Sequence, residues 1–153
     1  MRSVARRIPT GPTIDSSIFK SYDIRGIVPD QLNSEVARLI GRVFRTEIPG
    51  PVVAVGRDMR THSDELAAAL CRGLVQGGCT VIDVGQVSTD ALYFAVGHLQ
   101  SDGGIMVTAS HNPPEYNGFK MCRRDAEPLS GRDGINRIQE MISLGDADEP
   151  DAE

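Results

Sequence analysis

The sequence has few of the residues that mark several common protein classes. Its 153 residues include three cysteines and no tryptophan. The odd cysteine number, without a C-x-x-C spacing, argues against a disulfide framework or a zinc site and favours a reducing cytoplasm. No apolar run approaches the roughly 20 residues that span a bilayer. These absences exclude a secreted mini-protein and a membrane protein.

Positive charge is also scarce. Lysine and arginine together number 16 against 21 acidic residues, a net charge of -5, and the lysines are Lys20 and Lys120 alone. Without a basic surface the chain is not expected to bind nucleic acid. Hydrophobic residues make up 40% of the sequence, enough to bury a core, and the length predicts a single domain.

The two ends differ in composition from the middle of the chain. Residues 1–15 contain three arginines, two prolines and no long apolar stretch, which predicts a flexible N-terminal segment without a secretory signal. Residues 146–153 are acidic and predict a linker or tail. The folded domain is therefore expected over residues 16–145.

Between these ends, helical and strand patterns alternate. Apolar residues recur at helical spacing in segments that begin near Asn33, at Thr61 or Ser63, at Ser88 or Thr89, and at Ser130. Short apolar runs predict strands over 52–55, 79–84, 104–108 and 118–122. This alternation is typical of an α/β domain with a largely parallel sheet. Ligands of such sheets gather at the carboxyl ends of the strands.

The segment 108–120 carries the densest chemistry at such an end. Ser110 follows the predicted strand 104–108, and His111, Asn117 and Lys120 come close behind it. Asn117-Gly118 is a turn signal, which is expected to fold Lys120 back toward Ser110. The alternative is a polar loop whose serine only bonds backbone. A serine hydrolase is disfavoured, because the adjacent side chains of Ser110 and His111 diverge and no G-x-S-x-G motif is present.

Two further segments combine charged residues with a glycine. In residues 19–28, Arg25 is a candidate phosphate ligand, and the alternative is an edge strand with an Arg–Asp surface pair. In residues 56–60, Arg57 and Arg60 follow a strand and are candidates for an anionic ligand. A structural ion pair between Arg57 and Asp58 is the favoured interpretation there. The cysteines are expected in the core.

These motifs resemble the α-D-phosphohexomutase superfamily. Thr108-Ala-Ser110-His111-Asn112-Pro113 resembles its phosphoserine loop, and Tyr22-Asp-Ile-Arg25-Gly26 resembles its entry segment. The ending Asn117-Gly118-Phe119-Lys120 fits the same pattern. Residues 18–142 are similar to the first of four domains, most closely that of bacterial phosphomannomutase/phosphoglucomutase. The resemblance implies a three-layer α/β/α sandwich with a mixed, mostly parallel sheet.

The resemblance also implies roles for particular residues. Ser110 would carry a phosphoryl group, hand it to a sugar monophosphate, and take the other phosphate back from the bisphosphorylated sugar. Lys120 would act as general acid and base, provided that cationic neighbours lower its pKa. His111 and Arg25 would complete the catalytic set. The implied substrate-binding residues are Tyr22, Lys20 and Asn117.

The implied cofactor is Mg²⁺, with a sugar bisphosphate as activator. From this chain only Ser110, through its phosphate, would be a metal ligand, because the family's metal, sugar and phosphate loops lie in other domains. We therefore expect a cytoplasmic fragment that is inactive alone and needs the remaining domains to act on hexose phosphates. Its exposed interdomain surface is expected to favour self-association. The alternative is a stand-alone, non-catalytic binding or assembly module.

Overall fold

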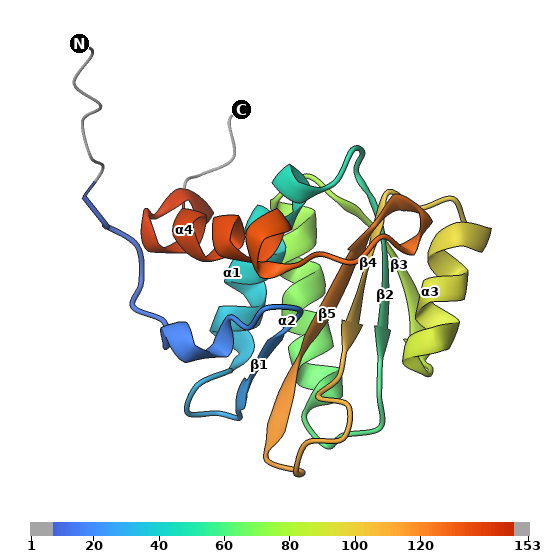
Figure 1. The fold of residues 1–153 in the computed structure, drawn as a ribbon, viewed down its shortest axis with the longest axis horizontal. Coiled ribbons are helices and arrows are strands. Elements are labelled where there is room, and N and C mark those ends of the chain that lie inside the picture. Colours follow the sequence, from blue (N-terminus) through green and yellow to red (C-terminus); the bar gives the residue numbers. More distant parts are fainter. Residues whose placement is uncertain (1–7, 149–153) are drawn as a thin grey trace.

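The computed structural model describes residues 8–148, and its strands form one mixed sheet (Figure 1). The strands are β1 (Ile24–Ile27), β2 (Val52–Arg57), β3 (Thr80–Gln86), β4 (Gly103–Val107) and β5 (Tyr116–Arg123), in the order β1-β5-β4-β2-β3. β2 is parallel to β3 and β4, whereas β5 is antiparallel to β4 and β1. Among these described strands β5 alone runs the opposite way, which confirms the mixed, mostly parallel sheet.

Helices cover both faces of this sheet, which gives the expected three layers. The longer helices are α1 (Ser34–Phe44), α2 (Ser63–Gln76), α3 (Thr89–His98) and α4 (Asn136–Ser143). Figure 1 shows α3 on one side of the sheet and α1, α2 and α4 on the other. Short helical turns are Ser16–Ile18, Arg45–Glu47, Arg124–Ala126, Gly131–Ile135 and Asp146–Asp148. The architecture is therefore an α/β/α sandwich.

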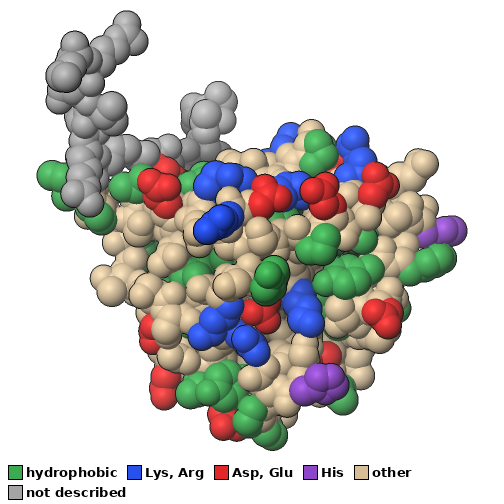
Figure 2. Space-filling model, in the orientation of Figure 1, with side chains coloured by type: hydrophobic (Ala, Val, Ile, Leu, Met, Phe, Trp, Pro, Cys, Tyr) green, Lys and Arg blue, Asp and Glu red, His purple; other side chains and the backbone are tan. Residues whose placement is uncertain are grey.

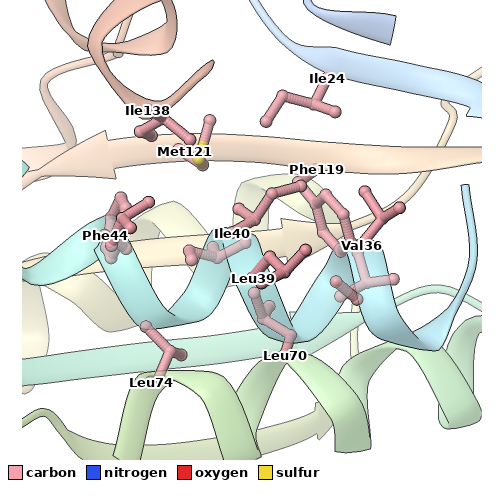
Figure 3. Packing of buried hydrophobic residues seen from close by; sticks show 14 of the residues in the cluster. Ile24, Val36, Leu39, Ile40, Phe44, Leu70, Leu74, Phe119, Met121 and Ile138 are labelled. Atoms are coloured by element: carbon pink, nitrogen blue, oxygen red, sulfur yellow. The ribbon is translucent and has the colours of Figure 1, made fainter. Parts of the chain in front are cut away.

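The larger core lies between the sheet and the α1, α2 and α4 layer. The apolar face predicted for α1 is buried throughout and comprises Val36, Leu39, Ile40, Val43 and Phe44. Figure 3 shows Phe119 of β5 pointing toward this face, and Met121 of the same strand belongs to the same buried cluster. A smaller cluster beneath α3 consists of Ala54, Leu92, Val96, Met106 and Cys122. Because side chains alternate along a strand, residue 120 of β5 shares the α3 face with Cys122.

The helix starts confirm two of the sequence predictions and correct another. Asn33 and Ser88 cap α1 and α3, each accepting a hydrogen bond from the backbone N–H three residues on. The last helix was expected to begin at Ser130, but the Ser130 side chain makes no capping bond. An irregular turn at Gly131–Ile135 comes first, because Gly134 has a φ of 136° that no regular helix accommodates. Regular α4 therefore begins only afterwards.

The chain near both ends packs more closely than its composition indicates. Within the predicted segment 1–15, Gly11 N–H donates to Ser143 and Thr10 Oγ1 to Leu144 at the end of α4. Within the predicted tail 146–153, residues 146–148 form a helical turn whose Ala147 is 1% exposed. Residues 1–7 and 149–153 lie outside the described part of the chain. The compact region thus includes residues that composition alone assigned to both ends.

Candidate active site

The loop that joins β4 to β5 presents Ser110 at the carboxyl end of the sheet. β2 and β4 are parallel neighbours, so the loops that follow them leave from the same edge. Ser110 is exposed and has a φ of 54°, a left-handed conformation that is uncommon for residues other than glycine. Such strained backbone clusters at functional sites. The loop therefore holds its serine in a costly, outward-facing conformation.

Arg60, in the loop after β2, ties this loop together. Its Nη1 donates to the carbonyl oxygens of Pro113 at 2.7 Å and Tyr116 at 3.0 Å. Its Nη2 donates to those of Asn112 at 2.7 Å and Ser110 at 3.0 Å. The Arg60 side chain is only 14% exposed. The guanidinium N–H groups therefore donate to backbone carbonyl oxygens rather than to solvent.

Asp58, in the same loop as Arg60, also supports the β4–β5 loop. Its Oδ2 accepts a 2.7 Å hydrogen bond from Thr108 Oγ1, which in turn accepts one of 3.0 Å from the backbone N–H of Ser110. Its Oδ1 accepts from Ser63 Oγ at 2.6 Å and from the Arg60 N–H at 3.1 Å. The β2 exit is therefore bonded to the β4 exit through several side chains.

The expected ion pair between Arg57 and Asp58 is absent from the contacts of the described residues. Arg57 Nε instead lies 2.5 Å from Asp64 of α2, and its Nη1 lies 3.4 Å from Asp83 of β3. Asp58 lies 3.4 Å from Arg60 Nε. Neighbouring residues of an extended strand point to opposite faces, so Arg57 and Asp58 turn away from each other. Neither Arg57 nor Arg60 lines the cationic cavity described below.

Asn117 does not form the predicted turn. It lies in β5, opposite Gly26 of β1, so the expectation that Asn117-Gly118 folds Lys120 back was wrong. Its side chain is fully buried, and its Nδ2 lies 2.9 Å from Ser63 Oγ and 3.0 Å from His62 Nδ1. Asn117 therefore fastens β5 to the start of α2 and does not reach a surface that a substrate would contact.

A cationic cavity of about 1120 Å³ opens on the α3 side of the sheet. Four predicted site residues line it: Lys20, Tyr22, Arg25 and Lys120. Arg25 stands opposite Gly118, two residues from Lys120 on the same face of β5. Figure 2 shows blue Lys and Arg side chains gathered on the face that this view presents. Strand pairing thus brings together residues that are far apart in sequence.

The charges around this cavity favour an anion. Its lining includes four cationic side chains and one acidic side chain, namely Lys20, Arg25, Lys120 and Arg132 against Asp23. Arg25 Nε lies 3.4 Å from Asp23 Oδ2, so part of its charge is compensated. The excess of positive charge contrasts with the net charge of -5 of the whole chain. A phosphate group fits such a surface.

The cavity also contains residues that the sequence patterns did not single out. Tyr93 of α3 lines it, and burial raises the pKa of its hydroxyl, with smaller contributions from Cys122, Asp90 and Asp23. The turn before α4 contributes residues 130–132, and Asn136 follows. Ser130-Gly131 is a recognisable turn signal, but nothing local to it indicates that it folds back beside β1. Gly131 N–H donates to the carbonyl of Ser21, which fixes that contact.

Apart from the buried Asn117, the predicted site residues therefore fall into two neighbouring groups. Ser110 and His111 are exposed on the β4–β5 loop and are not among the cavity-lining residues. Lys120 pairs with Met106, one step inside the last β4–β5 pair, Val107 with Phe119. The serine loop thus starts from the strand end beside Lys120.

Among residues 8–148, no group of three or more His, Cys, Asp or Glu side chains is arranged to hold a metal ion. Cys71, Cys79 and Cys122 are free thiols, of which the latter two are buried. Burial raises the pKa of Cys79 and of Cys122 to about 11, so both remain neutral core residues. In the described part, every helix is too short or too polar to cross a bilayer.

The fold and this site define an α/β/α domain that presents a serine loop beside a cationic cavity. The family model of phosphoglucomutase/phosphomannomutase, alpha/beta/alpha domain I, matches residues 16–148. The chain therefore belongs to this family.

Known proteins resemble the chain over most of its length. A phosphomannomutase of Klebsiella pneumoniae is 46% identical over 123 residues, which are 80% of this chain and 78% of that protein. One of Salmonella typhimurium is 44% identical over 128 residues, 84% of this chain and 28% of that protein. A phosphoglucomutase/phosphomannomutase family structure from Burkholderia thailandensis has a TM-score of 0.77 and 42% identity, covering 85% of this chain and 30% of its own. The chain thus spans less than a third of the Salmonella relative.

Proposed function

We propose that the chain is the phosphoserine domain of a phosphomannomutase/phosphoglucomutase, and that Ser110 carries the transferred phosphoryl group. The observation that carries this proposal is the exposed, left-handed Ser110 on a tightly bonded loop next to a cationic cavity. A nucleophile that both receives and gives up a phosphoryl group has to be accessible and fixed in place. Family membership supports the same role.

In the proposed reaction, a hydroxyl oxygen of a hexose phosphate attacks the phosphorus on Ser110. The new phosphorus–oxygen bond forms as the bond to Ser110 Oγ breaks. The hydroxyl proton passes to a base, and that base gives a proton to Ser110 Oγ, which leaves with the bonding electron pair. We assign that base to Lys120, which would return the proton in the reverse transfer. Arg25 and His111 then position the phosphoryl group, while Tyr22 and Lys20 at the cavity mouth contact the sugar phosphate.

The cationic cavity would offset the charge that a phosphoryl group brings to this surface. Mg²⁺ would supply further charge neutralisation during transfer, and Ser110 would reach it through its phosphate oxygens. The remaining metal ligands and the sugar-recognition residues would come from other domains. The chain alone is therefore proposed to lack mutase activity, with a sugar bisphosphate as the activator of the complete enzyme and with a cytoplasmic location.

The test is substitution of Ser110 in the protein as its source cells make it. Ser110→Ala is expected to lower interconversion of hexose 1-phosphate and 6-phosphate by more than about a thousandfold, as loss of a nucleophile does. Peptide mass mapping of the unsubstituted protein is expected to find a phosphoryl group on Ser110. Ser16→Ala, which removes another exposed hydroxyl, serves as the matched control and is expected to retain full turnover.

Two results would overturn the assignment. One is unchanged turnover of Ser110→Ala, and the other is a phosphoryl group on a different residue. A native protein that carries no phosphate on Ser110 and has no mutase activity would instead favour the non-catalytic module.

A further inference from the structure

Two side chains form hydrogen bonds to the backbone of Ser110, one to its N–H and one to its carbonyl oxygen. Its N–H donates to Thr108 Oγ1, and its carbonyl accepts from Arg60 Nη2, each at 3.0 Å. Thr108 is itself held by Asp58, which lies in the same loop as Arg60. The loop that follows β2 thus binds the Ser110 carbonyl directly, through Arg60, and its N–H indirectly, through Asp58 and Thr108.

Arg60 is suited to this task because both of its Nη nitrogens donate to carbonyl oxygens of this loop, while its Nε lies 3.4 Å from Asp58. The guanidinium contacts carbonyls on both sides of the Pro113-Pro114 bend, from Ser110 to Tyr116. No donor is directed into the cationic cavity, whose lining does not include Arg60. A cation that neither lines the cavity nor faces solvent is poorly placed to bind a ligand.

We propose that Arg60 is a positioning residue for phosphoryl transfer, which acts by keeping Ser110 in its left-handed conformation. The inference rests on the proposed function of Ser110. A non-glycine residue at positive φ is strained and persists only when its surroundings hold it. The hydrogen bonds from Arg60 to the loop carbonyls, together with the Asp58–Thr108 hydrogen bond, keep Ser110 in this conformation. Without these hydrogen bonds, the loop relaxes and the phosphoryl group leaves the position from which it is transferred.

The argument depends on the shape of the guanidinium as well as its charge. A planar fork presents several donors in fixed directions, whereas a lysine ammonium is a compact point charge. Arg60→Lys therefore keeps the positive charge near Asp58 but loses the simultaneous reach to carbonyls spread from Ser110 to Tyr116. Arg57→Lys is the matched control, because Arg57 pairs with Asp64 and Asp83 and makes no bond to this loop.

The first experiment measures hydrogen–deuterium exchange of the peptide 108–116 in the purified chain. Arg60→Lys is expected to speed exchange of that peptide by at least about tenfold, the effect of losing one charge-assisted hydrogen bond. Exchange in β2, β4 and α1 is expected to stay unchanged, and Arg57→Lys should leave the loop peptide as it is. Unchanged loop exchange in Arg60→Lys would overturn the inference.

The second experiment measures turnover in the complete native protein. Arg60→Lys is expected to lower kcat by at least about tenfold while KM for hexose phosphate changes less than about twofold, because Arg60 does not line the cavity. A rise in KM with unchanged kcat would overturn positioning and indicate a ligand contact. So would full turnover in a variant whose loop exchanges faster.

Thr108→Val provides an independent test should Arg60→Lys fail to fold. It removes the hydroxyl between Asp58 and the Ser110 N–H with little change of volume, and it is expected to lower kcat in the same way. Ser110→Ala separates the two proposals. If Ser110→Ala retains turnover, the proposed function fails, whereas exchange in the loop peptide still decides whether Arg60 holds Ser110.

Discussion

Two glycine substitutions, Gly73→Ala and Gly97→Ala, test whether close helix packing or helix propensity dominates the stability of this domain. Gly73 of α2 faces α1, and a Cβ added there would lie 2.0 Å from the carbonyl oxygen of Arg38. Gly41 of α1 is equally confined, with 2.4 Å to the carbonyl oxygen of Leu70. Ordinary van der Waals contact begins at 3.4 Å, so α1 and α2 would have to separate to admit either methyl group.

The expected magnitude follows from two opposing effects of Gly73→Ala. Alanine gains about 1 kcal/mol of helix propensity over glycine. Overpacking costs about 1–3 kcal/mol, and the cost is at its upper end here because the obstacle is backbone, which no rotamer change relieves. We therefore expect Gly73→Ala to lower the free energy of unfolding by about 2 kcal/mol. Gly97→Ala in α3 meets nothing within 4 Å and is expected to raise it by up to about 1 kcal/mol.

Urea unfolding of the purified chain at 25 °C measures both changes. The shift of the midpoint at constant m-value gives the difference in free energy. If Gly73→Ala proved as stable as the parent chain, the close approach of α1 and α2 would not limit stability and the reasoning would be refuted. A loss of stability in Gly97→Ala would show that propensity cannot be applied to α3.

Two further predictions concern ionisable side chains. The hydrogen bond from Arg124, and to a smaller extent one from the backbone N–H of Val52, holds the pKa of Asp102 below its ordinary value of 3.8. The ionised carboxylate therefore stabilises the fold above pH 3.8, and this stabilisation is lost as the pH falls through the lower pKa of the folded state. Asp102→Asn should therefore be less stable than the parent at pH 7, with a difference that shrinks in urea titrations carried below pH 3.8; a constant difference would contradict this. Burial raises the pKa of Cys79 and Cys122 to about 11, so a thiol reagent at pH 8 should modify the half-buried Cys71 first and the other two cysteines only on unfolding. Equal rates of modification for all three cysteines would contradict this prediction.

Local sequence patterns predicted those parts of the fold whose side chains follow a simple period. The apolar spacing from Val36 to Phe44 predicted α1, because each of those residues faces one core. The strand runs were placed within a few residues for the same reason. Asn117-Gly118 failed as a turn signal because Phe119 and Met121 are buried against α1, and strand pairing with β1 outweighs local turn preference.

The site was predictable only as far as its motifs are local. Ser110 stands out because it follows a strand in a segment rich in polar residues. Arg60 was recognised as a cation at a strand exit, but its partners lie 50 or more residues away, at Ser110 and beyond. The sequence therefore showed that Arg60 carries charge and could not show that this charge is directed at backbone carbonyls.

The sequence by itself determined the element types, the buried helix faces and the candidate nucleophile. Each of these depends on residues that are separated in sequence by no more than about one or two helical turns. The tertiary structure decided the strand order, which places β5 between β1 and β4. That order brings Arg25 beside Lys120 and the β2 exit beside Ser110. Such pairings depend on which distant segments bury their apolar faces together, a free-energy balance of the whole chain that no local pattern contains.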